Sequence, residues 1–356
     1  FCLAKGGYAY MSQHIGDLED ESVMRHLEEA IEDLKRLTGI RPEIVAYDSH
    51  PLYHSTAYAE QTGLKPVKVQ HHHAHIASVI AENCLTEPVI GVSFDGTGYG
   101  DDGTIWGGEF LVCRGASCKR AGHLKAFRQL GGDSSAKDAR KTATCMLLSE
   151  GLDEFIEERQ DGKILGIEAK ELQDKTKPDN TLPGKVLKDK TMACKTIPTR
   201  EMTIKDMPDE EIIKAALAHN INTVESSSMG RLFDAASSIL NICHYNTYEG
   251  KCAILLEQAA TRGKLAGKRP AKMSFDYKWE NGKIVFSARN ILLSLLSSED
   301  IEASALGFHN AVAEMIVKGC KEISGREEFS RGESIRNVAL SGGVFQNRLL
   351  FEEAVR

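Results

Sequence analysis

The stretch of sequence that decides the fold is VIGVSFDGTGYG at residues 89–100. Its start is typical of a buried strand, the glycine-rich part predicts a tight turn, and a second strand is expected at residues 108–112. We interpret this renewed strand, turn and strand as the start of a second lobe. We therefore predict an N-terminal lobe over residues 1–87 and a C-terminal lobe over residues 88–356.

The residues before this stretch predict alternating strands and helices. Apolar periodicity indicates a hairpin at residues 1–12, a helix at residues 20–38, a strand at residues 43–47 and a helix at residues 74–84. Strands that alternate with helices are typical of an α/β domain with a mixed or parallel sheet. The N-terminal lobe is therefore expected to contain such a sheet.

The residues after the stretch predict mainly helices and one more strand. Helices are expected at residues 210–222, 230–240 and 255–263, and a buried strand at residues 335–340 leads into Ser-Gly-Gly. Residues 151–205 are rich in lysine and glutamate and weakly periodic. We interpret this segment as a peripheral helical insertion in the C-terminal lobe.

The composition limits the classes to which the protein can belong. Its 356 residues are 42% hydrophobic and 27% charged, ordinary globular values that exclude a wholly disordered, collagen-like or coiled-coil chain. The net charge of −7, without a long basic run, argues against a nucleic acid as the main partner. No apolar run reaches the roughly 18 residues of a membrane span, so no membrane partner is expected.

The nine cysteines are dispersed along the chain, and no C-x-x-C motif occurs. The closest pair, Cys113 and Cys118, lacks the second half of a zinc finger. Dispersed cysteines in a long chain are typical of reduced, mostly buried thiols. We therefore expect the protein to be located in the cytosol.

The first candidate site is HHHAH at residues 71–75, which holds four of the twelve histidines. A strand is expected to deliver them to the first turn of a helix, where residues i and i+4 share a face. His71 and His75 could therefore present two imidazoles to one metal ion, although a helix start with solvated histidines would give the same pattern. His72 and His73 point elsewhere and are expected to support the site or to face a substrate.

The second candidate site is the glycine-rich stretch that begins at Asp95. Four glycines in eight positions follow a buried strand, so backbone amides of Gly96, Thr97 and Gly98 could approach a phosphate. Asp95, at the end of the strand, could bind a metal ion or position a water molecule. A hairpin turn is the simpler interpretation. The stretch is neither a P-loop nor a dinucleotide fingerprint, because a strand follows it.

Two further candidate segments lie at predicted helix starts. SSSMGRLFD contains Arg231 and Asp234, which share a helix face at i, i+3 and would equally suit a surface ion pair. SGGVFQNR at residues 341–348 joins a strand to a helix, and a helix N-terminus can bind an anion or a nucleotide. A tight strand-to-helix turn would give the same pattern, so the residues alone leave both interpretations open.

Taken in order, these segments resemble one family closely, the carbamoyltransferase domains of the HypF hydrogenase-maturation proteins. The resemblance covers residues 1–356 and is weakest at residues 151–205. The matching motifs are the opening FCL, SQHIGDL, DSHP, HHHAH, FDGTGYG with WGGE, and MGRLFD.

The resemblance implies a fold of two ribonuclease-H-like lobes of the actin/sugar-kinase/heat-shock-protein (ASKHA) class around a nucleotide cleft. It matches His71, His75 and Asp95 to metal ligands, which makes them the candidate catalytic residues. The cofactor-binding residues expected in addition to Gly96, Thr97 and Gly98 are Gly230, Arg231, Asp234, Gly342, Gly343 and Asn347.

The activity implied by the resemblance is carbamoyl transfer that depends on a metal ion, zinc or iron, and on ATP. Upstream domains of the family make carbamoyl-adenylate from carbamoyl phosphate and ATP. The partner HypE accepts the carbamoyl group on its C-terminal cysteine, in the biosynthesis of the cyanide ligand of NiFe hydrogenase. This chain is therefore expected to be an enzyme.

The ends of the chain also bear on its organisation. The chain begins at Phe1 inside a strand-like run and ends at Arg356 inside a helical pattern, so we expect an internal piece of a longer polypeptide. By the family resemblance, a first phosphate hairpin would precede Phe1. A final Asp-Gly-Gly segment with another metal ligand would follow Arg356.

Two kinds of alternative remain open at this point, other transferases and a non-catalytic module. A tRNA threonylcarbamoyl transferase and an O-carbamoyltransferase share the same catalytic module, although the acidic composition and the HHHAH form count against the tRNA enzyme. A non-catalytic module of actin-like fold that binds a metal ion or a nucleotide would carry the same motifs. A metalloprotease is disfavoured, because no glutamate follows the first histidine as the required base.

Overall fold

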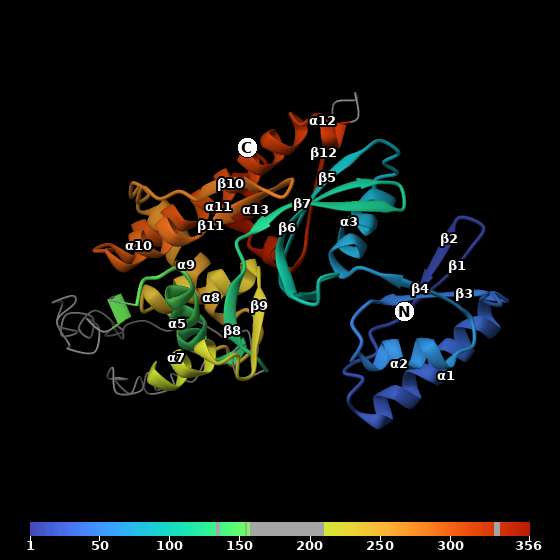
Figure 1. The fold of residues 1–356 in the computed structure, drawn as a ribbon. Helices are drawn as coiled ribbons and strands as arrows, with labels where there is room; N and C mark the ends of the chain where they lie inside the picture. The colour runs from blue at the N-terminus through green and yellow to red at the C-terminus, as the bar shows by residue number, and fades with distance from the viewer. Residues whose placement is uncertain (133–135, 154, 157–209, 331–334) are drawn as a thin grey trace, which may run out of the picture.

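The computed structural model describes residues 1–132, 136–153, 155–156, 210–330 and 335–356 of the chain (Figure 1). Its described part is mixed α/β, as the sequence predicts, with one eight-stranded sheet and two two-stranded sheets. Most of the predicted helical insertion, residues 157–205, lies outside the described residues. Among the helices of the described part, none is both long and apolar enough to cross a membrane.

The N-terminal segment, coloured blue, forms a small unit at one side of the molecule (Figure 1). β1 (Cys2–Lys5) and β2 (Tyr8–Met11) form an antiparallel hairpin. β3 (Ile44–Asp48) and β4 (Lys65–Val69) pair in parallel. The hairpin and the strand predicted from the sequence are therefore both present in this unit.

The helices of this unit begin and end where the local chemistry sets their limits. α1 (Glu21–Thr38) starts after Asp20, whose carboxylate accepts a hydrogen bond from the N–H of Ser22. It ends at Gly39, which adopts a φ of 66° that glycine tolerates well. α2 (His54–Gln61) packs beside β3. The helix predicted at residues 20–38 is confirmed.

The eight-stranded sheet forms the centre of the molecule. Its middle is an antiparallel meander of β5 (Val89–Tyr99), β6 (Ile105–Arg114) and β7 (Ser117–Leu124). β12 (Asn337–Ser341) lies parallel to β5, and β11 (Lys283–Ser287) lies parallel to β7. A meander with a parallel strand beside its first strand is the arrangement expected of a ribonuclease-H-like lobe. The remaining strands of the sheet are β8 (Phe127–Leu130), β9 (Thr223–Ser226) and β10 (Asp276–Glu280).

Helices pack around this sheet and share its apolar core. α8 (Met229–Ile239) and α11 (Ile301–Ser324) meet through Phe233 and Phe308, whose ring centroids lie 4.9 Å apart. The helices predicted at residues 210–222, 230–240 and 255–263 are all present. The other helices of the large unit are α5 (Ala139–Ser149), α7 (Glu210–Ala218), α9 (Lys251–Leu265), α10 (Arg289–Leu296), α12 (Glu327–Ser330) and α13 (Arg348–Ala354).

α3 (His71–Glu82) follows the N-terminal unit in the chain but packs on the large sheet (Figure 1). Ile76 is 0% exposed and packs in one apolar cluster with Val89, Trp106 and Leu111. Burial of this apolar face therefore brings the HHHAH motif to the edge of β5. The division of the chain between residues 87 and 88 stays a prediction.

The first part of the glycine-rich stretch after Phe94 is strand, and the predicted turn follows it. β5 continues to Tyr99, and β6 already begins at Ile105 instead of residue 108. The turn between these antiparallel strands contains Gly100 and Gly103, so the predicted hairpin is confirmed with a later and shorter turn. Gly98 serves a different purpose, because a side chain there would collide with the ring of His72 on α3.

The Ser-Gly-Gly junction does not start an α-helix. Gly343–Gln346 forms a 3₁₀ turn, η2, and α13 begins only after Asn347, which caps it. Gly342 adopts a φ of 102°, and a side chain there would collide with the carbonyl group of Phe94. The predicted helix N-terminus is therefore a short 3₁₀ turn that lies directly against β5.

Candidate metal and nucleotide site

His71 and His75 lie one turn apart at the start of α3, as their spacing predicts. Gln70 caps the helix by accepting a hydrogen bond from the N–H of His73 at 2.8 Å. Oδ2 of Asp95, on β5, lies 3.0 Å from Nε2 of His75 and 3.5 Å from Nε2 of His71. Ligand atoms of these three side chains all lie within 4.8 Å of one another, so together they could hold a metal ion.

The second ring nitrogen of each histidine faces a partner. Nδ1 of His71 lies 2.7 Å from Oδ2 of Asp48, at the end of β3. Nδ1 of His75 lies 3.5 Å from Oγ of Ser341, at the end of β12. A carboxylate at Nδ1 fixes the ring and leaves Nε2 as the ligand atom, which is the usual arrangement around a bound metal. The set of two imidazoles and one carboxylate therefore fits zinc or iron.

The charges in this cluster follow from the same contacts. Hydrogen bonds with Asp48 and Asp95 raise the pKa of His71 to about 9. Burial by itself would raise the pKa of Asp95, but hydrogen bonds from His71, His75 and the N–H of Gly96 outweigh burial and lower it. Asp95 is therefore an anion, and a metal ion would replace the proton that His71 directs toward it.

The structure separates the other two histidines of the motif. His72 is 0% exposed and lies beside Trp106, with 6.0 Å between the ring centroids. Burial lowers the pKa of His72 to about 4, so this ring is neutral and supports the cluster by packing. His73 instead approaches the sulfur atoms of Cys113 and Cys118. It does not join the cluster of His71, His75 and Asp95.

The start of α8 packs against the backbone of β5. A Cβ on Gly230 would lie 2.8 Å from Cα of Gly96, so the approach depends on glycine. Ser228 caps α8 by accepting a hydrogen bond from the N–H of Arg231 at 3.1 Å. The same hydroxyl donates to the carbonyl group of Gly96 at 2.7 Å. β5 and α8 are thus joined where the glycine-rich stretch meets the helix.

Arg231 and Asp234 form a largely buried ion pair, with 2.9 Å between Nη1 and Oδ2, and not the surface pair that was an alternative. Burial raises the pKa of Asp234, whose Oδ1 also accepts a hydrogen bond from Asn246 at 3.1 Å. Arg231 donates to the carbonyl group of Ala136 at 2.9 Å. Its Nε is buried without a hydrogen-bond partner among the described residues, and its Nη2 lies beside Gly96.

The end of β12 meets the cluster at Asp95. Oδ1 of Asp95 faces two backbone N–H groups, that of Gly96 at 2.8 Å and that of Gly343 at 3.4 Å. Asn347 is buried, accepts a hydrogen bond from the N–H of Leu350, and donates to Nε2 of His309 at 2.9 Å. Gly343 therefore contacts the cluster directly, whereas Asn347 holds the following helix in place.

Most of the residues predicted for the site lie together. Asp234 and Asn347 are the exceptions, because their side chains are used in buried hydrogen bonds behind it. The assignment of these residues to a metal ion and a nucleotide stays a prediction. The predicted residues at the edge of β5, or on the elements that touch it, are His71, His75, Asp95, Gly96, Thr97, Gly98, Gly230, Arg231, Gly342 and Gly343.

Two carboxylates near the site were not predicted as site residues. One is Asp48, which orients His71. The other is Glu109, which is 0% exposed and accepts hydrogen bonds from Nε of Arg120 at 2.6 Å and from Oγ of Ser227 at 2.5 Å. Both belong to motifs that were noted in the sequence, DSHP and WGGE. Their roles depend on partners from other elements, which a single motif does not reveal.

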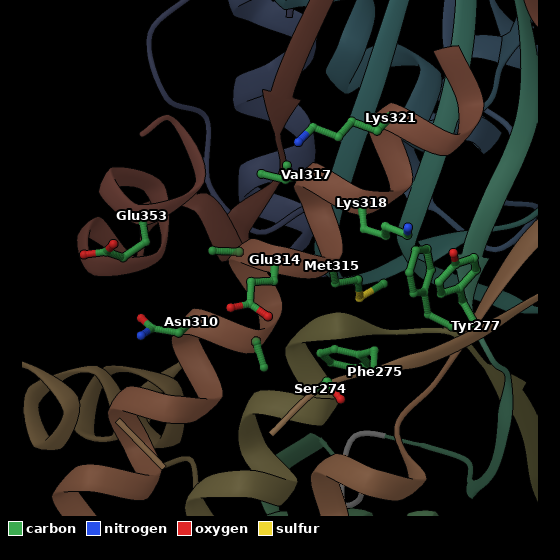
Figure 2. A pocket seen from close by; sticks show the side chains of 13 residues that line it. Ser274, Phe275, Tyr277, Asn310, Glu314, Met315, Val317, Lys318, Lys321 and Glu353 are labelled. Atoms are coloured by element: carbon green, nitrogen blue, oxygen red, sulfur yellow. The ribbon is translucent and has the colours of Figure 1, made fainter. Parts of the chain in front are cut away.

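A groove of about 560 Å³ lies elsewhere, along α11 and beside β10 and β11 (Figure 2). Figure 2 shows that its lining mixes both charges, with Glu314, Lys318 and Lys321, and that Lys318 lies beside the ring of Tyr277. None of the residues predicted for the site lines this groove. The candidate site is therefore the edge of β5 and not this groove.

A ribonuclease-H-like sheet, with a histidine pair and a carboxylate where β5, β12 and α3 meet, defines a domain of the ASKHA class. The sequence narrows this class. Residues 1–82 match the family described as "HypF Kae1-like domain", and residues 91–356 match "Carbamoyltransferase, Kae1-like Domain, second subdomain". The chain therefore belongs to the HypF carbamoyltransferase family, which confirms the resemblance found in the sequence.

Individual relatives agree with this assignment. The chain is 30% identical over 356 residues to Carbamoyltransferase HypF of Synechocystis sp., covering 99% of this chain and 41% of that protein. It is 30% identical over 360 residues to a Carbamoyltransferase HypF homolog of Cupriavidus necator, covering 98% and 79%. A crystal structure of full-length HypF in the phosphate- and nucleotide-bound form superposes with a TM-score of 0.77 at 31% identity, covering 99% and 40%. The chain thus spans about two fifths of these two longer relatives.

Proposed function

We propose that this chain transfers the carbamoyl group of carbamoyl-adenylate to the C-terminal cysteine of HypE. The observation that carries the proposal is the cluster of His71, His75 and Asp95 beside a glycine-lined strand edge. The names of the relatives supply the reaction class. In the full family, carbamoyl-adenylate would come from carbamoyl phosphate and ATP through other domains. A reaction that needs a free thiol on the acceptor suits the reducing cytoplasm.

In the proposed reaction the thiolate of the acceptor cysteine attacks the carbamoyl carbon. A carbon–sulfur bond forms, the bond from that carbon to the phosphoryl oxygen of AMP breaks, and AMP leaves. The proton of the thiol passes to solvent. The chain provides no nucleophile in this scheme, and its contribution is to hold donor and acceptor in a reactive orientation.

His71, His75 and Asp95 would hold a divalent metal ion, zinc or iron. When bound, such an ion supplies Lewis-acid polarisation of a donor oxygen. Asp48 keeps the ring of His71 in place, and the N–H of Gly96 keeps the carboxylate of Asp95 in place. The ligand atoms are therefore positioned by the protein itself, which reduces the reorganisation needed on binding.

The nucleotide part of the donor is assigned to the edge of β5 next to this cluster. Glycines let a phosphate approach the backbone closely, although the N–H groups of Gly96 and Gly343 already face Oδ1 of Asp95. Arg231 places its guanidinium beside Gly96, and Thr97 is exposed at the same edge. The residues assigned to the nucleotide share this edge, and they are Gly96, Thr97, Gly98, Gly230, Arg231, Gly342 and Gly343.

The test supplies carbamoyl-adenylate and HypE to this chain completed at both ends as in its longer relatives, and it measures the mass of HypE. The unchanged chain is expected to carbamoylate the terminal cysteine. Asp95→Asn is expected to slow transfer by roughly a thousandfold or more, because a lost metal ligand costs several kcal/mol of transition-state stabilisation. Glu29→Gln removes an exposed carboxylate on α1 and is expected to react at the unchanged rate. Transfer by Asp95→Asn at that rate would contradict the proposal.

A further inference from the structure

A second group of metal-ligating side chains lies beside α3, apart from the cluster of His71, His75 and Asp95. It consists of His73, Cys113 and Cys118, whose ligand atoms all lie within 4.8 Å of one another. Two residues along an α-helix are about 200° apart around its axis. His73 therefore points away from His71 and toward the hairpin of β6 and β7. The proposed carbamoyl transfer uses none of these three side chains.

The register of the hairpin brings the two thiols together. Cys113 on β6 lies directly opposite Cys118 on β7, and their sulfur atoms are 3.2 Å apart. Cys113 is 0% exposed and packs in the apolar cluster that contains Ile76 of α3, and Cys118 packs against the same cluster. The pair therefore faces the helix from within the core and not from a free surface.

His73 distinguishes this pair from two ordinary buried thiols. Its Nε2 is buried and has no hydrogen-bond partner among the residues that the structure describes. Leaving a buried polar group unpaired is destabilising. An ion between the ring and the two sulfur atoms would give the imidazole a partner and would bring the three side chains into one coordination sphere.

We propose that His73, Cys113 and Cys118 form a second metal site, which takes a thiolate-preferring divalent ion such as Zn²⁺. Two thiolates and an imidazole suit zinc and disfavour Mg²⁺ and Ca²⁺, which prefer oxygen ligands. Tetrahedral zinc ligands with bonds of about 2.0–2.3 Å lie about 3.5–3.8 Å apart. The ligand atoms of His73 and the cysteines need to approach by only about 1 Å to reach this geometry.

The charge state of the pair depends on whether a cation is bound. Contact with Cys113, burial, and the negative charge of Asp101 all raise the pKa of the Cys118 thiol in the absence of metal, so that thiol is then protonated. A divalent cation offsets the charge of two thiolates, and each thiol releases its proton to solvent on binding. Asp101 is exposed in the turn after β5 and is not one of the clustered ligands, so a water molecule would take the fourth position.

An ion at this position would connect the hairpin of β6 and β7 to α3. Because α3 also carries His71 and His75, the second ion would hold the helix on which the first cluster is built. The role is structural, since Cys113 lies in the apolar core and the proposed carbamoyl transfer uses none of the three side chains. The two sites can therefore be tested separately.

The test is a titration of the full chain, reduced and freed of metal, with CoCl₂. Cobalt bound to thiolates gives a charge-transfer band in the near ultraviolet, which a site of two imidazoles and a carboxylate does not give. We expect the intensity of this band to reach that of one thiolate-bound cobalt ion per chain, at no more than two equivalents of cobalt, because the first cluster can take up an ion that gives no such band. We expect it to be lost in Cys118→Ser and to require at least tenfold more cobalt in His73→Ala. His75→Ala should keep the band, because His75 belongs to the first cluster only. A failure of the proposed carbamoyl transfer can therefore be distinguished from a failure of the second metal site.

Cys243→Ser is the matched control, because it removes a half-buried thiol elsewhere, and it should keep the band. Circular dichroism reports whether Cys118→Ser folds. If it does not fold, His73→Ala, which leaves both thiols in place, decides the outcome. A chain without the band contradicts the proposal, as does a band that survives unchanged in His73→Ala.

Discussion

The two clusters around α3 differ in how their ligand atoms are held. In the first, Asp48 fixes the ring of His71, and a backbone N–H fixes Asp95. In the second, a ring nitrogen of His73 has no partner among the described residues, and Cys113 lies in an apolar core. Both clusters offer three protein ligands, but within the described part of the chain only the first has ligand side chains held by hydrogen bonds to residues outside the cluster. One helix thus presents one preorganised cluster and one whose histidine gains a partner when an ion binds.

Removal of a ligand should have the largest effect and should separate the two clusters. In His75→Ala, only His71 and Asp95 remain, so we expect loss of the metal from the first cluster and roughly a thousandfold slower carbamoyl transfer. Metal content by mass spectrometry and the mass of HypE measure both effects. His14→Ala, which removes an exposed histidine, is the control. Unchanged metal content in His75→Ala would mean that the first cluster does not bind the metal ion, which contradicts the prediction.

Removal of the carboxylate behind a ligand should have an intermediate effect. Asp48→Asn keeps the shape of the side chain but weakens its bond to Nδ1 of His71, so metal affinity of the first cluster should fall by about 10–100-fold. Competition with a chelator measures this affinity. Asp17→Asn, at an exposed position of the N-terminal unit, should change nothing. An affinity of Asp48→Asn equal to that of the unchanged chain would mean that the cluster is not preorganised.

The smallest effect is expected at the partner of the second histidine. Ser341→Ala removes a neutral hydroxyl that lies 3.5 Å from Nδ1 of His75, a long contact for a hydrogen bond. Such a bond contributes at most about 0.5–1.5 kcal/mol, so affinity should fall less than in Asp48→Asn. The same chelator competition compares the two variants. A larger loss of metal affinity in Ser341→Ala than in Asp48→Asn would mean that Ser341, and not Asp48, is the more important partner of the histidine pair.

Sequence reasoning succeeded where the relevant contacts are local. The spacing of His71 and His75 alone predicts that both rings share a face of α3, because helix geometry fixes that relation. The same holds for the limits of α1, which the cap at Asp20 and Gly39 determine. The family could be identified for a similar reason, since its motifs are short, contiguous runs.

Sequence reasoning failed where contacts between distant segments determine the structure. Gly96 and Gly98 were expected in a turn with Gly100 and Gly103, yet they lie in a continuing strand and allow α8 and α3 to approach it. Asp48 and His71 meet across two elements, and His73 finds Cys113 and Cys118 only because the hairpin packs on α3. Periodicity and spacing carry no information about such pairings, which follow from burial of the whole sheet.

The contact between Asp95 and the N–H of Gly343 joins residues 248 positions apart in the chain. It exists only when β12 has taken its place beside β5, and β12 is the last strand of the described sheet. During synthesis on the ribosome, Asp95 would emerge long before this partner does. The nascent chain therefore carries His71, His75 and Asp95 in an incompletely supported state until nearly all of the domain has been made. Metal loading of the first cluster would accordingly come late, as an event of the finished domain.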